Sequence, residues 1–84
     1  MNFYELEQRV VFQEQRALDL TMASPFRVRA EEIRSARDEA RTLAQSLRSY
    51  GDATNQLLSR LDAVMVDLIC VDERIRSFYQ RAAA

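Results

Sequence analysis

The sequence predicts an all-α fold, a small bundle of three antiparallel helices over about residues 2–22, 25–50 and 53–81. Apolar residues recur at three- and four-residue spacing along each segment, which is the pattern of a helix with one buried face. The chain has one glycine and one proline, too few for the turns of a many-stranded β domain. Both stand between the periodic segments, and the 84 residues suit a single domain, 1–84.

The first segment carries two neighbouring apolar rows. One row follows helical spacing if the polar Gln13 takes one position, and its apolar members are Phe3, Leu6, Val10, Ala17 and Leu20. The second row widens the apolar face and consists of Tyr4, Val11 and Leu18. Ser24 is a favourable N-cap, and Pro25 suits the first position of a helix. We therefore expect one helix to end near Met22 and the next to begin at Pro25.

The second and third segments both keep a heptad. The second contains Phe26, Arg29, Ile33, Ala36, Ala40, Leu43, Leu47 and Tyr50. The third has the strongest pattern in the chain, with Leu57, Leu61, Val64, Leu68, Val71, Ile75 and Phe78 spaced four and three residues apart. Between them, Gly51 and Asp52 form a C′ glycine followed by an N-cap, in a cluster of poor helix formers that favours a turn.

A continuous helix over residues 25–81 is the alternative to a turn at Gly51. The heptad of the second segment continues in phase into the third, and a glycine inside a helix costs only about 1 kcal/mol. In that arrangement the short first helix folds onto one long helix, and a second chain stabilises the pair as a coiled-coil dimer.

Composition excludes several kinds of catalytic and metal-binding site. With one cysteine and no histidine, the usual zinc sites, Cys–His or Ser–His nucleophile pairs and disulfide frameworks are ruled out. A single glycine cannot build a phosphate-cradling loop. We therefore expect no catalytic residue, no cofactor and no metal ion, and the chain is predicted not to be an enzyme. A catalytic carboxylate pair formed by Glu7 and Glu14 is the alternative, because both stand among apolar residues.

The expected compartment follows from the same residues. The longest apolar run, Val64–Val71, contains Asp67 and is far shorter than the about 20 residues of a membrane span. No secretory signal pattern precedes the first helix, and a lone cysteine in an apolar run is typical of a reducing environment. We expect a cytoplasmic protein without membrane contact. All 12 basic residues are arginine, as GC-rich codon usage in a bacterial or phage genome would produce.

The far side of the third segment is the strongest functional signal. Opposite its heptad, where charged residues are expected, the chain has Ala63, Val66, Ile69 and Cys70, with Met65 on the flank. Contiguous exposed apolar residues usually mark an interface, so we predict a protein interface here, joined by an exposed Phe12. The alternative is that the first two helices wrap the third from both sides and bury this face.

An arginine row on the second segment is the next candidate. Arg27, Arg34, Arg41 and Arg48 are seven residues apart, and Arg37 lies nearby. Such a row could bind the phosphates of RNA or DNA. However, acids stand three or four residues from these arginines, and the second segment carries +2 between neighbours of −2 and −1. Internal pairing is therefore the preferred interpretation, and nucleic acid is not the expected partner.

An ion pair is predicted inside the hairpin of the first two helices. Folding the chain about Ser24 brings Glu14 close to the level of Arg29 and Ile33. We expect a partly buried pair of Glu14 with Arg29, or alternatively with Arg37. Such pairs add little net stability but can fix the register of two helices.

These features together predict a non-enzymatic helical module that docks on a larger protein partner as an adaptor, chaperone or inhibitor. Self-association as a homodimer through the third helix is expected. The alternative function is a dimeric helical bundle that binds RNA or DNA phosphates through the arginine row.

Overall fold

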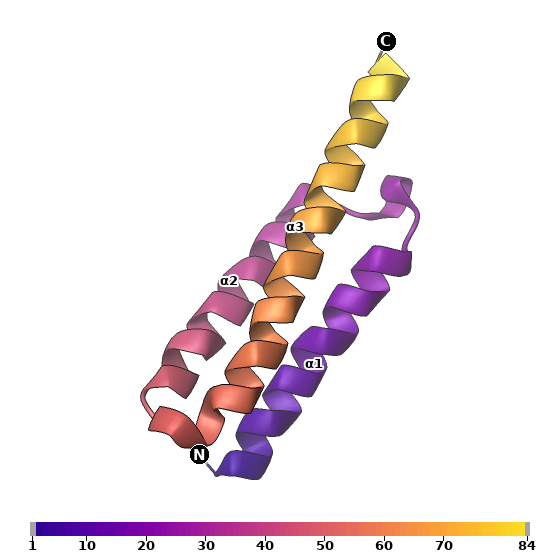
Figure 1. Cartoon of the computed structure of the whole chain (residues 1–84). Coiled ribbons are helices and arrows are strands. Elements are labelled where there is room, and N and C mark those ends of the chain that lie inside the picture. The colour runs from indigo at the N-terminus through magenta and orange to yellow at the C-terminus, as the bar shows by residue number, and fades with distance from the viewer. Residues whose placement is uncertain (1, 84) are drawn as a thin grey trace.

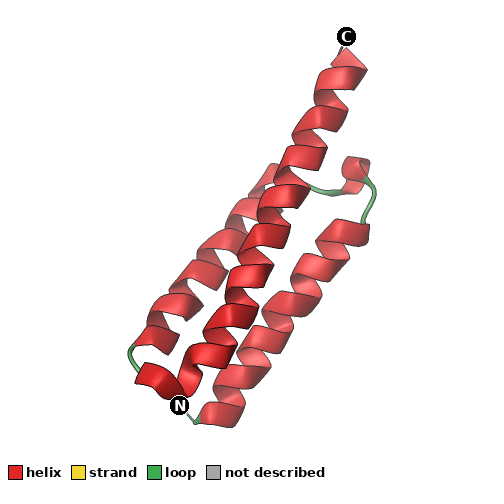
Figure 2. Ribbon diagram, in the orientation of Figure 1, coloured by secondary structure: helices red, strands yellow, loops and turns green. Residues whose placement is uncertain are grey.

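The computed structural model describes residues 2–83, and these form three α-helices and two short 3-10 turns. In chain order the elements are α1 (Phe3–Met22), η1 (Pro25–Arg27), α2 (Ala30–Arg48), η2 (Gly51–Thr54) and α3 (Asn55–Ala83). The helices lie side by side, with α1 and α3 running in one direction and α2 in the other (Figure 1). No strand occurs in this part of the chain, and the predicted three-helix bundle is confirmed (Figure 2).

Side chains that satisfy free backbone groups hold both ends of α1. At its start, the Asn2 Oδ1 accepts a hydrogen bond of 2.8 Å from the backbone N–H of Glu5. At its end, the Arg74 guanidinium of α3 donates to the carbonyl oxygens of Thr21 (2.7 Å) and Leu20 (3.3 Å). A cation at a helix C-terminus also complements the helix dipole. This contact therefore fixes the end of α1 against the middle of α3.

The link between α1 and α2 is longer than the sequence predicts. Pro25 begins the short turn η1 rather than α2, the Ser24 side chain makes no capping bond, and α2 begins only at Ala30. The reason is Val28, which is buried in an extended conformation and so ties the link to the core. The predicted helix start at Pro25 is therefore wrong. Phe26 is not a seam residue either, because its ring packs against Phe78 of α3.

The link between α2 and α3 is a turn, so the continuous helix over residues 25–81 is wrong. Gly51 has φ of 75°, a left-handed conformation that interrupts the helix. The buried Thr54 hydroxyl lies within hydrogen-bond distance of the carbonyl oxygens of Leu47 (2.7 Å) and Gly51 (3.0 Å). Asp52 lies inside η2 and is not the N-cap that the sequence predicts.

The core sits along one side of α3, between α1 and α2. Six of its seven predicted seam residues are buried: Leu57, Leu61, Val64, Leu68, Val71 and Ile75. Burial of each such side chain is worth about 1.5–3 kcal/mol relative to exposure. The small residues Ala36 and Ala40 of α2 are also buried, which allows its backbone to approach the others. The last turns of α3 project beyond the other helices in a molecule 49 Å long and 17 Å wide (Figure 1).

Candidate interaction surfaces

The outer face of α3 is exposed, as the interface prediction requires. Val66 is 58% exposed and Ile69 46%, and Ala63 and Cys70 are exposed as well. Met65 is half-buried and packs against the core. Within residues 2–83, α1 and α2 leave this face uncovered, so the alternative in which they bury it is wrong. Whether a partner covers it stays a prediction.

The second apolar row of α1 is also on the surface, contrary to the sequence prediction. Tyr4, Val11 and Leu18 are all exposed, because α1 buries only the row that contains Leu6 and Val10. Gln13 takes the polar position of that buried row, as predicted. The row Tyr4, Val11 and Leu18 is thus available for contact with another molecule.

The exposed residues of α1 and α3 meet in one surface. Leu18 and Ala63 line the same depression, about 300 Å³ in volume, between the two helices. A smaller depression next to it contains Cys70. Val11 and Tyr4 stand one and two heptads before Leu18 and so continue the surface along α1. We name this surface the α1–α3 face; it comprises Tyr4, Val11, Leu18, Ala63, Val66 and Cys70.

A forked ion pair crosses the α1–α3 face. The Arg60 Nε and Nη2 donate to the two carboxylate oxygens of Glu14 at 3.1 and 2.5 Å. These hydrogen bonds raise the pKa of Arg60 above its ordinary value, against the desolvation that lowers it; the charges of Glu14 and Glu7 add to the rise. A bidentate arginine–carboxylate contact fixes orientation as well as distance, so it sets the register of α1 against α3.

The predicted partner of Glu14 is therefore wrong. Arg29 is exposed at the N-cap of α2, and Arg37 forms no ion pair with any described residue. The extended link through Val28 changes the position of α2 along the bundle axis relative to α1. As a result Glu39, rather than Ile33, stands opposite the middle of α1. In addition, Glu14 faces α3 instead of α2. The sequence prediction was therefore wrong about the level of α2 beside α1 and about the rotation of α1 around its own axis.

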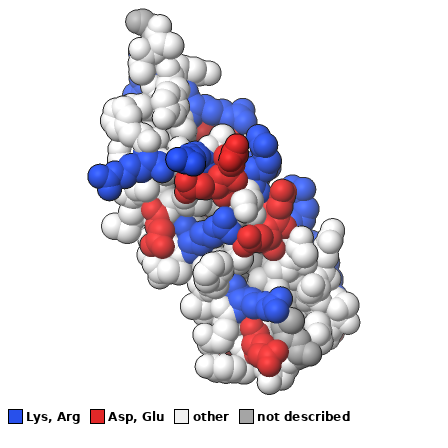
Figure 3. Space-filling view, turned by 180° about the vertical axis from the view of Figure 1, so that it is seen from behind, with Lys and Arg blue, Asp and Glu red and all other residues white. Residues whose placement is uncertain are grey.

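The arginine row of α2 lacks the predicted acidic partners. Among residues 2–83 the ion pairs are Arg16–Glu39, Arg60–Glu14 and Arg76–Asp72. None includes the row, of which Arg27 lies in η1, outside α2, and the other members, Arg34, Arg37, Arg41 and Arg48, lie in α2. The expected pairing of α2 arginines with acids is thus wrong; the one α2 residue in an ion pair between helices is an acid. On the face seen in Figure 3, acidic and basic side chains nevertheless interleave.

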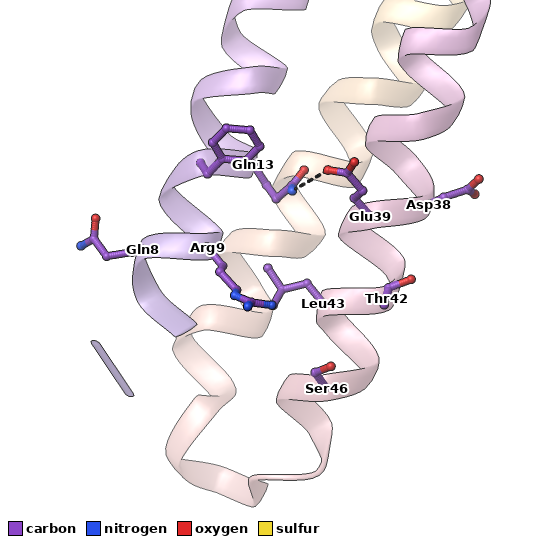
Figure 4. Close-up of a pocket in the computed structure, with 9 residues that line it drawn as sticks. Gln8, Arg9, Gln13, Asp38, Glu39, Thr42, Leu43 and Ser46 are labelled. Carbon is purple, nitrogen blue, oxygen red and sulfur yellow. Dashed lines mark hydrogen bonds between the residues drawn. The ribbon is translucent and has the colours of Figure 1, made fainter. Parts of the chain in front are cut away.

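A groove between α1 and α2 is a separate surface. It has a volume of about 600 Å³, and its apolar lining comes from Phe12 of α1 and Leu43 of α2. Figure 4 shows the groove with its polar lining: Gln8, Arg9, Gln13, Asp38, Glu39, Thr42 and Ser46. Phe12 is 60% exposed here and does not line the depressions between α1 and α3. The predicted interface residues thus divide between two surfaces.

Gln13 is the functional candidate that the sequence prediction missed. It is only 7% exposed, and its Nε2 donates to the Glu39 Oε2 at 3.3 Å, while its buried Oε1 has no hydrogen-bond partner. The sequence signal for it is a polar residue at a buried position of an otherwise apolar row. Buried side-chain oxygens rarely lack a donor, so such an atom marks a candidate binding site.

Within residues 2–83, no three His, Cys, Asp or Glu side chains are grouped closely enough to hold a metal ion. In the same range, no helix has both the length and the apolar character needed to cross a membrane. No family model, curated protein or solved structure matches the chain. The surfaces themselves are therefore the basis for any functional assignment.

Proposed function

We propose that this protein is a non-enzymatic helical interaction module that docks on a larger protein as an adaptor, chaperone or inhibitor and self-associates as a dimer. The α1–α3 face carries the proposal. Its exposed apolar side chains follow two parallel neighbouring helices, with Leu18 and Ala63 lining one depression between them. Exposed apolar side chains that gather on one side of a protein usually mark an interaction surface.

The shape of this face favours a helix as the docking element. Two parallel helices leave a groove along their contact, and an amphipathic helix can lay its apolar side into it. The exposed outer side of α3, with Val66 and Ile69, can supply such a helix to a second copy of the chain. Burial of Val66 and Ile69 in a dimer would remove two exposed β-branched apolar side chains of α3 from water.

The proposed compartment is the cytoplasm. Cys70 is a free thiol and is exposed on the α1–α3 face. In a reducing compartment an exposed thiol persists without forming a disulfide. A dimer held by apolar contacts near Cys70 therefore needs no covalent link.

The test is a charge placed on the exposed outer side of α3, followed by light scattering and circular dichroism. We expect Val66→Glu and Ile69→Glu to reduce the mass from a multiple of 9.8 kDa to 9.8 kDa while helicity is retained. Phe12→Glu is the matched control, since Phe12 has nearly the same exposure as Val66 but lines the other groove. Unchanged mass in the α3 variants, or an equal effect of the control, contradicts the proposal.

A second candidate function is phosphate binding by the arginine row. It is favoured by the absence of ion pairs to Arg34, Arg41 and Arg48 among the described residues. If these side chains contact RNA or DNA, the logarithm of the binding constant decreases linearly with the logarithm of the salt concentration. On duplex DNA the slope is roughly 0.9 for each phosphate contacted. Arg34→Ala and Arg41→Ala should then each reduce the slope by about one, whereas Arg81→Ala, outside the row, should not. Binding that is insensitive to salt excludes this function.

A further inference from the structure

The groove between α1 and α2 combines an apolar lining with a buried acceptor that lacks a donor. Phe12 and Leu43 supply the apolar surface from opposite helices. The Oε1 of Gln13 is buried and accepts no hydrogen bond. Access of a ligand to the buried Gln13 carboxamide requires a side-chain movement, and Phe12, which lines the same groove and is 60% exposed, has room to change rotamer. The site is on a different surface from the α1–α3 face.

The orientation of the Gln13 carboxamide is fixed by its neighbour. Figure 4 shows the side chain lying across the groove toward Glu39. A carboxylate accepts hydrogen bonds, so only the NH₂ end of the amide can face it, as in the bond of 3.3 Å from Nε2. Glu39 is itself held by Arg16 at 2.6 Å, so this arrangement is secured from both sides. Rotation of the amide would place two acceptors together, and hence Oε1 must receive a donor from elsewhere.

The lining also defines the charge of the ligand. Glu39 is paired with Arg16, and the remaining charged residues of the groove are one arginine and one acid, Arg9 and Asp38. The site therefore has no charge excess that would favour an ion. A neutral planar group with one N–H donor can pack against the apolar lining and at the same time donate a hydrogen bond to the free acceptor. Among protein side chains, this describes the indole of tryptophan, which donates but does not accept.

We propose that the α1–α2 groove binds a tryptophan side chain of a partner protein, with the indole ring between Phe12 and Leu43 and its N–H donating to the Gln13 Oε1. The volume of about 600 Å³ falls in the range of ligand sites. Tryptophan, with tyrosine and arginine, is also enriched among the residues that dominate interface energies.

The probe is N-acetyltryptophanamide, which carries the side chain between two peptide groups. Because the chain contains no tryptophan, the fluorescence of the probe can be followed without background from protein indole. We expect saturable binding with a blue shift. The analogue methylated at the indole nitrogen lacks the donor, and it should bind about 2–10-fold more weakly, the ratio that one net hydrogen bond provides.

Two variants test the assigned contacts. Gln13→Leu places an apolar residue in the core row and removes the acceptor, so the two probes should then bind equally. Phe12→Ala should weaken both probes by the same factor. Val66→Glu, on the α1–α3 face, is the control and should change neither affinity.

The outcomes separate this site from its alternatives. The proposal is overturned if no saturable binding occurs or if the two probes bind the unaltered protein with equal affinity. It is also overturned if the ratio of the two probes' affinities is the same in Gln13→Leu as in the unaltered protein. Tighter binding of free tryptophan than of N-acetyltryptophanamide would also overturn it, because the source would then be the amino acid. The mass of the protein in light scattering reports on the α1–α3 face independently, so failure here leaves the proposed function untouched.

Discussion

Replacing Gly51 by alanine should test the turn that separates this bundle from a continuous long helix. Gly51 adopts φ of 75°, and a Cβ atom built on it would have no neighbour within 4 Å. The cost of Gly51→Ala is therefore conformational and not steric, about 1–2 kcal/mol for an L-residue in the left-handed region. For a domain of this size, the loss corresponds to a decrease of about 4–16 °C in Tm.

The same substitution favours the competing structure. Alanine is better than glycine inside a helix by about 1 kcal/mol, so the balance between turn and continuous helix moves by about 2–3 kcal/mol in total. Since 1.4 kcal/mol is a factor of ten, the population of an extended form should rise about 30- to 150-fold. Such a form would expose the seam of α3 and pair with a second chain.

Thermal unfolding and light scattering measure the two effects. Gly51→Asn is the matched variant, because asparagine tolerates the left-handed region, and it should lose less stability than Gly51→Ala. A D-alanine at position 51, introduced by chemical synthesis, should retain or increase the Tm. If the L- and D-alanine proteins unfold at the same temperature, the reasoning from the backbone conformation is refuted.

Three further substitutions test the packing and polar contacts. Leu61→Ala, at a fully buried seam position, should cost about 2–5 kcal/mol in urea unfolding, and a smaller loss would place Leu61 outside the core. Thr54→Val should cost about 0.5–1.5 kcal/mol by the same measurement, because the carbonyl oxygen of Leu47 keeps a backbone donor; equal stability would exclude the hydroxyl contact. Arg60→Gln should cost less stability in a Glu14→Gln background than alone, whereas additive losses in this double-mutant cycle would show that the two side chains do not interact.

The periodic elements were predictable because periodicity reports on burial within one helix. The uninterrupted spacing from Leu57 to Ile75 correctly predicts the buried seam of α3, and Gly51 correctly predicts the turn. The start of α2 was not predictable from Ser24 and Pro25. Their local preference for a helix start is outweighed by burial of Val28 in an extended link, which depends on the core around it.

Contacts between helices were not predictable from spacing alone. The rotation of α1 about its axis decides that Glu14 meets Arg60 of α3, and two adjacent apolar rows gave no means to choose the buried one. The expected pairs of α2 failed for an energetic reason. An exposed pair of charges four residues apart is worth only about 0.3–0.5 kcal/mol, which the entropy of two long side chains can offset.

The position of the Glu14–Arg60 pair bears on how the α1–α3 face could bind a partner. Each side chain is more than a third exposed, so water still solvates the pair in the isolated chain. A partner that covers Leu18 and Ala63 would remove this water from the depression that Glu14 and Arg60 also line. Burial of an ion pair is costly unless its hydrogen bonds are complete, and the forked geometry supplies two of them before any partner arrives. The pair is thus arranged to tolerate burial, and it gives the α1–α3 face one fixed point of orientation.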